Sequence, residues 1–260
     1  MRELSGTALL DALEQGEVRA AEPLPGGAGW RVNAWVKAAI LELFRSSPAV
    51  EIGDARELWP FVDKAPLTLR RFDRTHGVRL VPGGSAVRRG AHVGRDVVLM
   101  PPCYVNVGAW IGAGALIDSH GLVGSCAQIG ARVHVSAGAQ IGGVLEPVGA
   151  RPVIVEDECL IGGQCGLYEG VHVGARAVLG AGVILTATTR VFDVVEEREL
   201  RGTQDEPLAI PPRAVVVPGT RALGGDWARE RGLALASALI VKYRDEATDA
   251  RTALEEALRP

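Results

Sequence analysis

An aspartate stands where the surrounding sequence repeats glycine. In the stretch IGAGALIDSHGLVGSCAQIG, residues 111–130, glycine follows an aliphatic residue at positions 112, 124 and 130, whereas Asp118 follows Ile117. A carboxylate held on a rigid support can act as a general base. Aspartate also tolerates left-handed corners better than most residues. On the pattern alone, Asp118 is either a working carboxylate or a tolerated corner residue.

Histidines offer a second possible chemistry. His120 lies two residues after Asp118, and His92, His134 and His172 each precede an aliphatic residue, where a strand side chain would point outward. Three histidines from adjacent subunits could hold zinc with an open position, as a metal-dependent hydratase requires. No close histidine pair has ligand spacing, so surface positions are the simpler interpretation and no metal is expected.

Composition restricts the classes of function. The 260 residues carry a net charge of −3, which disfavours nucleic-acid and membrane-surface partners because both attract basic proteins. No apolar run reaches 18 residues, and the acidic, amphipathic N-terminus is unlike a secretory signal. A cytoplasmic protein is therefore expected. The four cysteines form no C-x-x-C pair, and we expect them to be small buried thiols.

The element that must position these side chains is a six-residue repeat. Every sixth residue is Val, Ile or Leu in two series, Val81 to Ile141 and Val155 to Val191, with a slip of two between them. A helix has no period of six and a simple strand has period two, so short strands must alternate with tight corners. Residues two before the aliphatic are mostly small, as a narrow filled interior requires. Three hexapeptides make an 18-residue coil, and the coils stack at about 4.8 Å. The sequence therefore predicts a hexapeptide parallel β-helix and a mainly β fold.

The flanks of the repeat lack its period. Residues 1–76 are predicted to form a small helical N-terminal domain, with helices at 34–44 and possible helix at 1–15. The β-helix is predicted over 77–220, with loops at 143–154 and 192–209. Residues 221–260 are predicted to form a C-terminal extension. Its ALIVKY segment could be a strand or a helix end, and its charged tail is predicted to be a helix. The flanks could cap the ends of the stack.

Several segments resemble the tetrahydrodipicolinate N-succinyltransferases, in the family's order along almost the whole chain. The most specific are GSCAQIG (124–130), IGGVLEP (141–147) and WVKAAILELFR (35–45); the others include GVRLVPG (77–83) and IDSHGLVG (117–124). The resemblance implies a left-handed coil, a homotrimer, and transfer of a succinyl group from succinyl-CoA to an amine of a small amino dicarboxylate in diaminopimelate and lysine biosynthesis.

The resemblance also implies roles for single residues. The family's general base falls on Asp118, and its arginine for a substrate carboxylate falls on Arg79. Backbone amides at Gly142 and Gly143 are candidates to hold the oxyanion of the thioester, and Arg213 and Lys242 are candidates for the CoA phosphates. The loop after Gly143 is expected to cover the acyl-CoA or a neighbouring subunit, or else to be a passive surface loop.

Two positions depart from the family. An acid proposed to assist catalysis falls on Gly166, and an aromatic residue falls on His120. These departures motivate an alternative to the succinyltransferase, a paralogous N-acyltransferase that acts on another amino acid or uses acetyl-CoA. The metal-dependent hydratase and a non-catalytic scaffold are the remaining alternatives, and an intact pair of Arg79 and Asp118 argues against the scaffold.

Overall fold

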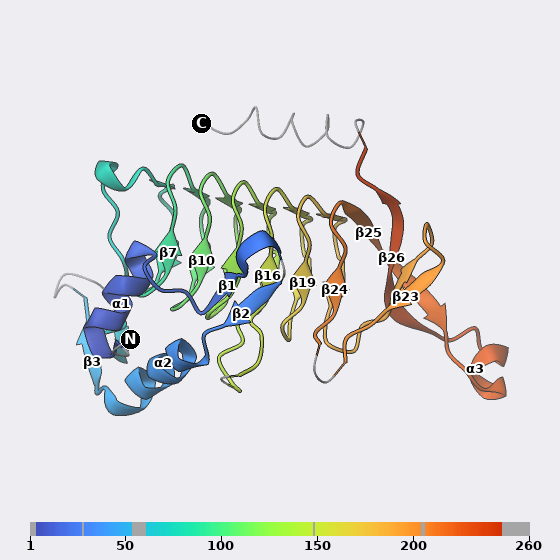
Figure 1. Cartoon of the computed structure of the whole chain (residues 1–260), viewed down its shortest axis with the longest axis horizontal. Helices are drawn as coiled ribbons and strands as arrows, with labels where there is room; N and C mark the ends of the chain where they lie inside the picture. Colours follow the sequence, from blue (N-terminus) through green and yellow to red (C-terminus); the bar gives the residue numbers. More distant parts are fainter. Residues whose placement is uncertain (1–3, 28, 54–60, 148, 204–205, 246–260) are drawn as a thin grey trace.

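The computed structural model describes residues 4–27, 29–53, 61–147, 149–203 and 206–245. Most of the chain forms three long sheets through which it passes in rotation (Figure 1). Sheet I contains β5 (Arg79–Leu80), β8 (Val98–Leu99), β11 (Leu116–Ile117), β14 (His134–Val135), β17 (Leu160–Ile161) and β20 (Val178–Leu179). Sheet II contains β6 (Ala86–Val87), β9 (Tyr104–Val105), β12 (Leu122–Val123), β15 (Gln140–Ile141), β18 (Gly166–Leu167) and β21 (Ile184–Leu185). Sheet III contains β7 (His92–Val93), β10 (Trp110–Ile111), β13 (Gln128–Ile129), β16 (Ile154–Val155), β19 (His172–Val173) and β24 (Ala209–Ile210).

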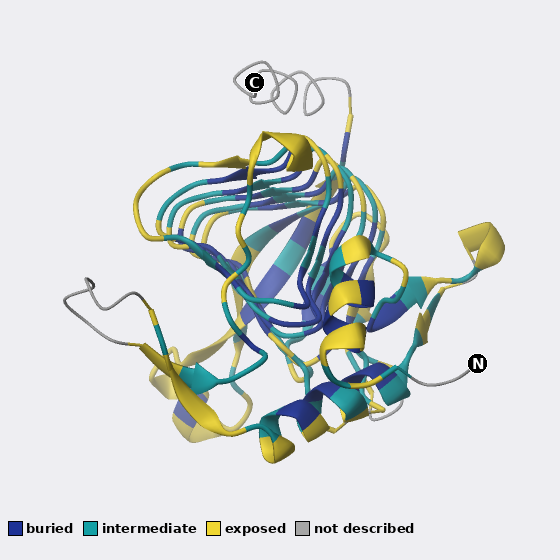
Figure 2. Cartoon of the chain, turned by 90° about the vertical axis from the view of Figure 1, so that its left-hand side faces the viewer, coloured by how far each residue is buried: buried dark blue, intermediate teal, exposed yellow. Residues whose placement is uncertain are grey.

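Within each sheet of the stack, a strand pairs in parallel with the strand of the next coil, usually 18 residues on, as Ile111 does with Ile129. This is the strand arrangement of a parallel β-helix, and the mainly β fold is confirmed. The aliphatic residues of the repeat form one buried core together with alanines and cysteines from two positions earlier. Viewed along the stack, the buried residues line the inside of the coils (Figure 2).

The repeat deviates from its predicted register in three places. Leu80, not Val81, pairs with Leu99, so the first coil has one extra residue at its corner. The slip after Gly143 is an insertion, because Gln128 pairs with Ile154, 26 positions on. Val191 leaves the stack for β22 (Val191–Asp193), and Ile210 takes its expected place beside Val173.

Glycine after the aliphatic residue has a different role from the one expected. The left-handed residue stands two positions further on, as at His120 (φ 61°) and Arg132 (φ 55°). The glycines themselves permit close stacking, because a Cβ on Gly112 would lie 2.5 Å from the backbone nitrogen of Ala131 in the next coil. The corner explanation for Asp118 is therefore wrong, since its position needs no left-handed backbone.

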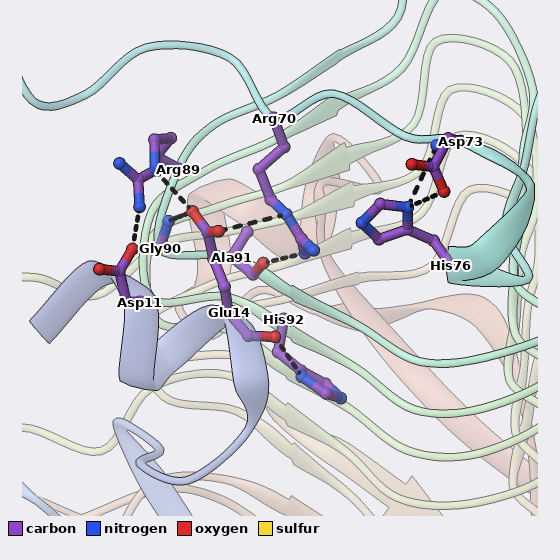
Figure 3. Close-up of polar contacts among 9 residues, drawn as sticks. All are labelled: Asp11, Glu14, Arg70, Asp73, His76, Arg89, Gly90, Ala91 and His92. Carbon is purple, nitrogen blue, oxygen red and sulfur yellow. Dashed lines mark hydrogen bonds and ion pairs between the residues drawn. The ribbon is translucent and has the colours of Figure 1, made fainter. Parts of the chain in front are cut away.

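The N-terminal region contains α1 (Gly6–Gln15) and α2 (Ala34–Ser46), together with two hairpins that the sequence did not indicate, β1 (Ala21–Pro23) with β2 (Trp30–Val32) and β3 (Ala49–Ile52) with β4 (Phe61–Lys64). Charged contacts fix α1 to the first coil (Figure 3). Glu14 accepts hydrogen bonds from Arg89 Nε at 3.0 Å and from the Gly90 amide at 2.9 Å, and it pairs with Arg70. The N-terminal helices thus pack along the corners between sheets II and III, from the start of the stack.

The other end is closed by β25 (Ala214–Ala222) and β26 (Ala234–Tyr243), a long antiparallel pair that extends sheet I. The ALIVKY segment is therefore a strand. The loop predicted at 192–209 contains a hairpin of β22 and β23 (Arg198–Leu200), and α3 (Asp226–Glu230) connects β25 to β26. The predicted charged helix falls on 246–260, outside the described residues. Across the described residues, none of the helices is long and apolar enough to span a bilayer.

Candidate active site

Asp118 lies at the edge between sheets I and II, directly after β11. Its side chain is half-buried, and Oδ1 accepts a hydrogen bond of 2.7 Å from the amide of Ser119. The residues at the same edge in the coils before and after are Met100 and Ser136, so this part of the edge carries side chains where other corners carry glycine. The second carboxylate oxygen of Asp118 has no protein donor in the described part of the chain and is available to a ligand.

Arg79 lies on the same sheet, at the start of the stack. It pairs with Val98, which pairs with Leu116, two residues before Asp118. Two ladder steps of about 4.8 Å place Arg79 about 10 Å from Asp118 along the stack. The Arg79 side chain is exposed. The register therefore places Arg79, the predicted carboxylate-binding residue, on the sheet whose edge carries Asp118, the predicted base.

Gly142 and Gly143 lie on a different edge, between sheets II and III. They line a pocket with Tyr168, Glu169 and Thr186. The amide of Gly142 already donates to the carbonyl of Leu167 at 2.7 Å, whereas the amide of Gly143 makes no hydrogen bond within the described chain. Of the two predicted oxyanion donors, the structure leaves only the Gly143 N–H available.

The loop after Gly143 is tied to α2 of the same chain. Lys37, whose side chain is fully buried, donates to the carbonyl oxygens of Pro147 at 3.2 Å and Ala150 at 2.7 Å. Burial lowers the pKa of Lys37. Leu145 from the loop packs against the cluster formed by α1 and α2. The loop therefore has a defined position beside the pocket at Gly143.

The two predicted phosphate ligands lie at the far end of the stack. Arg213 follows β24 and donates to the carbonyl of Arg244, and Lys242 on β26 contacts Asp245, with 3.2 Å between Nζ and Oδ2. Neither lies on the edge that carries Asp118, and both remain predictions.

Tyr168 directly follows Leu167, at a position where the repeat usually has glycine. Its ring lies over sheet II: a Cβ on Gly166 would lie 2.6 Å from Tyr168 Cε2, and one on Gly142 would lie 2.8 Å from Cδ1. The space above Gly166, where the family's acid was expected, is therefore filled by the phenol ring. A tyrosine at a position that usually holds glycine was the sequence signal for this feature. The direction of its ring depends on Gly142 in the neighbouring coil, which the local sequence does not reveal.

Glu156 is a second carboxylate that directly follows an aliphatic residue, at the edge between sheets III and I. It accepts hydrogen bonds from Trp30 Nε1 at 3.1 Å, the Ala175 amide at 3.0 Å and His172 Nε2 at 2.9 Å. The hydrogen bond from His172 is the largest of the contacts that lower the pKa of Glu156 to about 2.

His92 is stacked on Trp110 with 3.8 Å between ring centroids. Within the described residues, no three His, Cys, Asp or Glu side chains are grouped as metal ligands.

Comparisons with known proteins show similarity over most of the chain. Residues 7–45 match the N-terminal region of tetrahydrodipicolinate N-succinyltransferase, and residues 152–187 match the hexapeptide repeat of succinyl-transferase. A 2,3,4,5-tetrahydropyridine-2,6-dicarboxylate N-succinyltransferase from Xylella fastidiosa (strain Temecula1) is 44% identical over 96% of this chain and 86% of its own length. The protein of that name from Idiomarina loihiensis is 40% identical over 96% of this chain and 87% of its own length.

One solved structure shares the fold over most of the chain. The putative 2,3,4,5-tetrahydropyridine-2-carboxylate N-succinyltransferase from Campylobacter jejuni aligns with a TM-score of 0.52 at 19% identity, and the alignment covers 90% of this chain and 63% of the other. The identity to the curated relatives extends over nearly the whole chain. The chain therefore belongs to the 2,3,4,5-tetrahydropyridine-2,6-dicarboxylate N-succinyltransferase family.

Proposed function

We propose that this protein transfers the succinyl group of succinyl-CoA to the amine nitrogen derived from tetrahydropyridine dicarboxylate, in the biosynthesis of diaminopimelate and lysine in the cytoplasm. The observation that carries the proposal is the placement of Asp118 and Arg79 along one sheet of a chain that is 44% identical to an enzyme of that name.

Asp118 is the general base of the proposed reaction. The nitrogen must lose a proton to attack, because an alkylammonium has no free electron pair and a pKa of about 10. The nitrogen forms a bond to the thioester carbonyl while the Asp118 carboxylate takes its proton. Collapse of the intermediate then breaks the C–S bond, and the departing CoA sulfur receives a proton. The local hydrogen bond from Ser119 fixes the carboxylate without occupying its second oxygen.

Arg79 holds the acceptor. A guanidinium pairs bidentately with a carboxylate and so fixes the orientation of a dicarboxylate as well as its position. With Arg79 about 10 Å along the stack from Asp118, one carboxylate of the acceptor binds at Arg79 while its amine reaches Asp118. Alignment of the two reactants supplies much of the acceleration, because it replaces a chance encounter in solution.

The complete site forms between copies of the chain in a homotrimer of left-handed coils. Asp118 and Gly143 lie at the two opposite edges of sheet II in one chain. A site that uses both residues therefore needs Asp118 from one copy and Gly143 from a second copy. The outward positions of sheet II include Leu122 and Ile184, the latter 49% exposed, which suits a face shared by copies. Three chains of 27.4 kDa predict a particle of about 82 kDa by light scattering. A monomer at working concentrations would contradict this arrangement.

The acyl-CoA lies along the groove between the copies. The Gly143 N–H is then the donor for the oxyanion, the neighbouring Gly142 allows close approach of the thioester, and Arg213 and Lys242 contact the CoA phosphates. The loop fixed by Lys37 covers this groove. The pocket at Gly143 supports the proposal because it is a concave surface with a free amide.

The alternative is an N-acyltransferase for a different amino acid, or one that uses acetyl-CoA. The observation in its favour is Tyr168, whose ring narrows the pocket beside Gly142 and Gly143. Release of free CoA thiol, followed with succinyl-CoA and acetyl-CoA against tetrahydropyridine dicarboxylate, 2-aminopimelate and single amino acids, distinguishes the two. We expect the highest kcat/KM with succinyl-CoA and the tetrahydropyridine dicarboxylate. A preference for another pair establishes the alternative, and no thiol release with any pair excludes both.

A further inference from the structure

A second pocket lies on the edge between sheets III and I, away from Asp118. The β1–β2 hairpin crosses this edge (Figure 1), and the pocket between them is lined by Arg19, Trp30, Trp110, Glu156 and Asp157 together with small corner residues. The walls are mostly indole rings, glycine and alanine. The pocket is therefore aromatic and built on the coils of the stack.

Arg19 is a cation in this pocket without a full set of acceptors. Its guanidinium carbon lies 3.9 Å from the centroid of the Trp110 ring, and Nε donates to Gln128 Oε1 at 3.0 Å. Its two Nη atoms have no acceptor among the described residues. Burial lowers the pKa of Arg19 to about 10, although Glu22 and Asp157 partly oppose that shift. The charge of Arg19 is thus only partly compensated within the chain.

The carboxylates around Arg19 are not equally engaged. Glu22 is paired with Arg31, and Glu156 is held by Trp30, His172 and the Ala175 amide. Asp157 differs, because Oδ1 accepts the Ala131 amide at 2.8 Å while Oδ2 has no donor in the described parts of the chain. The pocket consequently presents unpaired donors on Arg19 and an unpaired acceptor on Asp157.

We propose that this pocket binds a free α-amino acid. The carboxylate of the ligand accepts from Arg19 Nη, its ammonium donates to Asp157 Oδ2, and its side chain packs on the indole of Trp30, because Arg19 and His92 cover the two faces of Trp110. The two acids that line the pocket disfavour phosphate dianions by like-charge repulsion. A simple carboxylate would leave Asp157 without a donor. The site is on a different edge from Asp118, so it stands independently of the proposed transferase function.

Calorimetric titration of the full-length protein tests the proposal, with each of the twenty protein amino acids used singly and inorganic phosphate as a comparison. We expect saturable binding of at least one amino acid, with one molecule per chain, and no comparable binding of phosphate. For that amino acid, its α-amide and its deaminated acid should each bind at least tenfold more weakly, since each loses one charged contact.

Variants of the protein assign the binding to this pocket. Asp157→Asn should lower the affinity for the amino acid at least tenfold and leave the affinity for the deaminated acid unchanged. Asp96→Asn, at another exposed corner, should change neither affinity. Arg19→Gln should lower the affinity for both the amino acid and its deaminated acid. Binding should persist in Asp118→Asn, which separates this pocket from the acyl-acceptor site. The proposal is overturned if no amino acid binds at 10 mM, a concentration about a thousandfold above the Kd of a tight metabolite site. It is also overturned if neither Asp157→Asn nor removal of the ligand's amino group changes the affinity.

Discussion

Asp118 and Glu156 occupy the same position of the repeat and have opposite surroundings. Each directly follows a buried aliphatic residue, Ile117 or Val155. Among the described residues, Asp118 accepts one hydrogen bond, from its own neighbour Ser119, whereas Glu156 accepts three from residues at least 16 positions away. The repeat supplies a rigid support, and the groups that pack on it decide whether the carboxylate is available for chemistry or committed to the fold.

The largest expected effect is on turnover in Asp118→Asn. Asparagine keeps the size and the local hydrogen bond but cannot take a proton, so thiol release should fall by about 10²- to 10⁴-fold. The midpoint of thermal unfolding should change little, because Asp118 makes one local contact. Stopped assays of CoA release on the purified, folded variant measure the loss.

Glu156→Gln should show the reverse pattern. Loss of the charge weakens three hydrogen bonds, so unfolding should become easier by about 2–3 kcal/mol, or about 5–10 °C in the midpoint. Turnover per folded molecule should stay within about threefold of wild type, which is the ordinary scatter of a residue outside the chemistry. An unchanged unfolding midpoint would mean that the hydrogen bonds from Trp30 and His172 to Glu156 do not stabilise the fold.

Acid unfolding gives a second measure of Glu156. Its pKa is lowered from 4.5 to about 2 in the folded chain, so the stability it contributes is complete above pH 4.5 and is lost as the pH falls toward 2. The difference in unfolding midpoint between wild type and Glu156→Gln should therefore shrink on acidification through that range. A constant difference would indicate that the carboxylate charge is not what stabilises the fold.

Arg79→Gln should affect acceptor binding more than the chemical step. Removal of a bidentate charged contact should lower kcat/KM for the dicarboxylate by about 10- to 100-fold, mainly through KM. Because Arg79 is exposed at the start of the stack, the unfolding midpoint should not change. Equal kcat/KM in the variant and wild type would remove Arg79 from the site.

His120→Asn is expected to have the smallest effect. His120 has a left-handed backbone, which asparagine tolerates, and its ring is exposed with no hydrogen-bond partner in the described residues. Turnover should change by less than about threefold, the scatter expected for a residue outside the chemistry. A loss comparable to that of Asp118→Asn would transfer the role of base to the histidine.

The six-residue period was sufficient to predict the stack, because every inward position needs an aliphatic side chain. It also located the insertion after Gly143. It could not predict that Leu80 replaces Val81 in the first coil or that Val191 leaves the stack, because both are decided by pairing with distant strands. The closeness of Gly112 to Ala131 is likewise a property of neighbouring coils, so sequence alone suggested a corner role for such glycines.

The site was predictable only in part. The placement of Asp118 and Arg79 along one sheet follows from the register of sheet I. The surroundings of Glu156 do not follow from any local pattern, since Trp30 lies 126 positions away and reaches it through the β1–β2 hairpin. The visible signal was an acid at a glycine position of the repeat, the same signal that drew attention to Asp118.

The double variant Asp118→Asn/Glu156→Gln tests the separation of the two carboxylates most directly, because turnover and unfolding are measured on one protein. Distant sites with separate roles should behave additively, within about 0.5 kcal/mol. The double variant should therefore have the turnover of Asp118→Asn and the unfolding midpoint of Glu156→Gln. Turnover close to wild type after loss of the Asp118 carboxylate, in the single or the double variant, would contradict the assignment of Asp118 as the base.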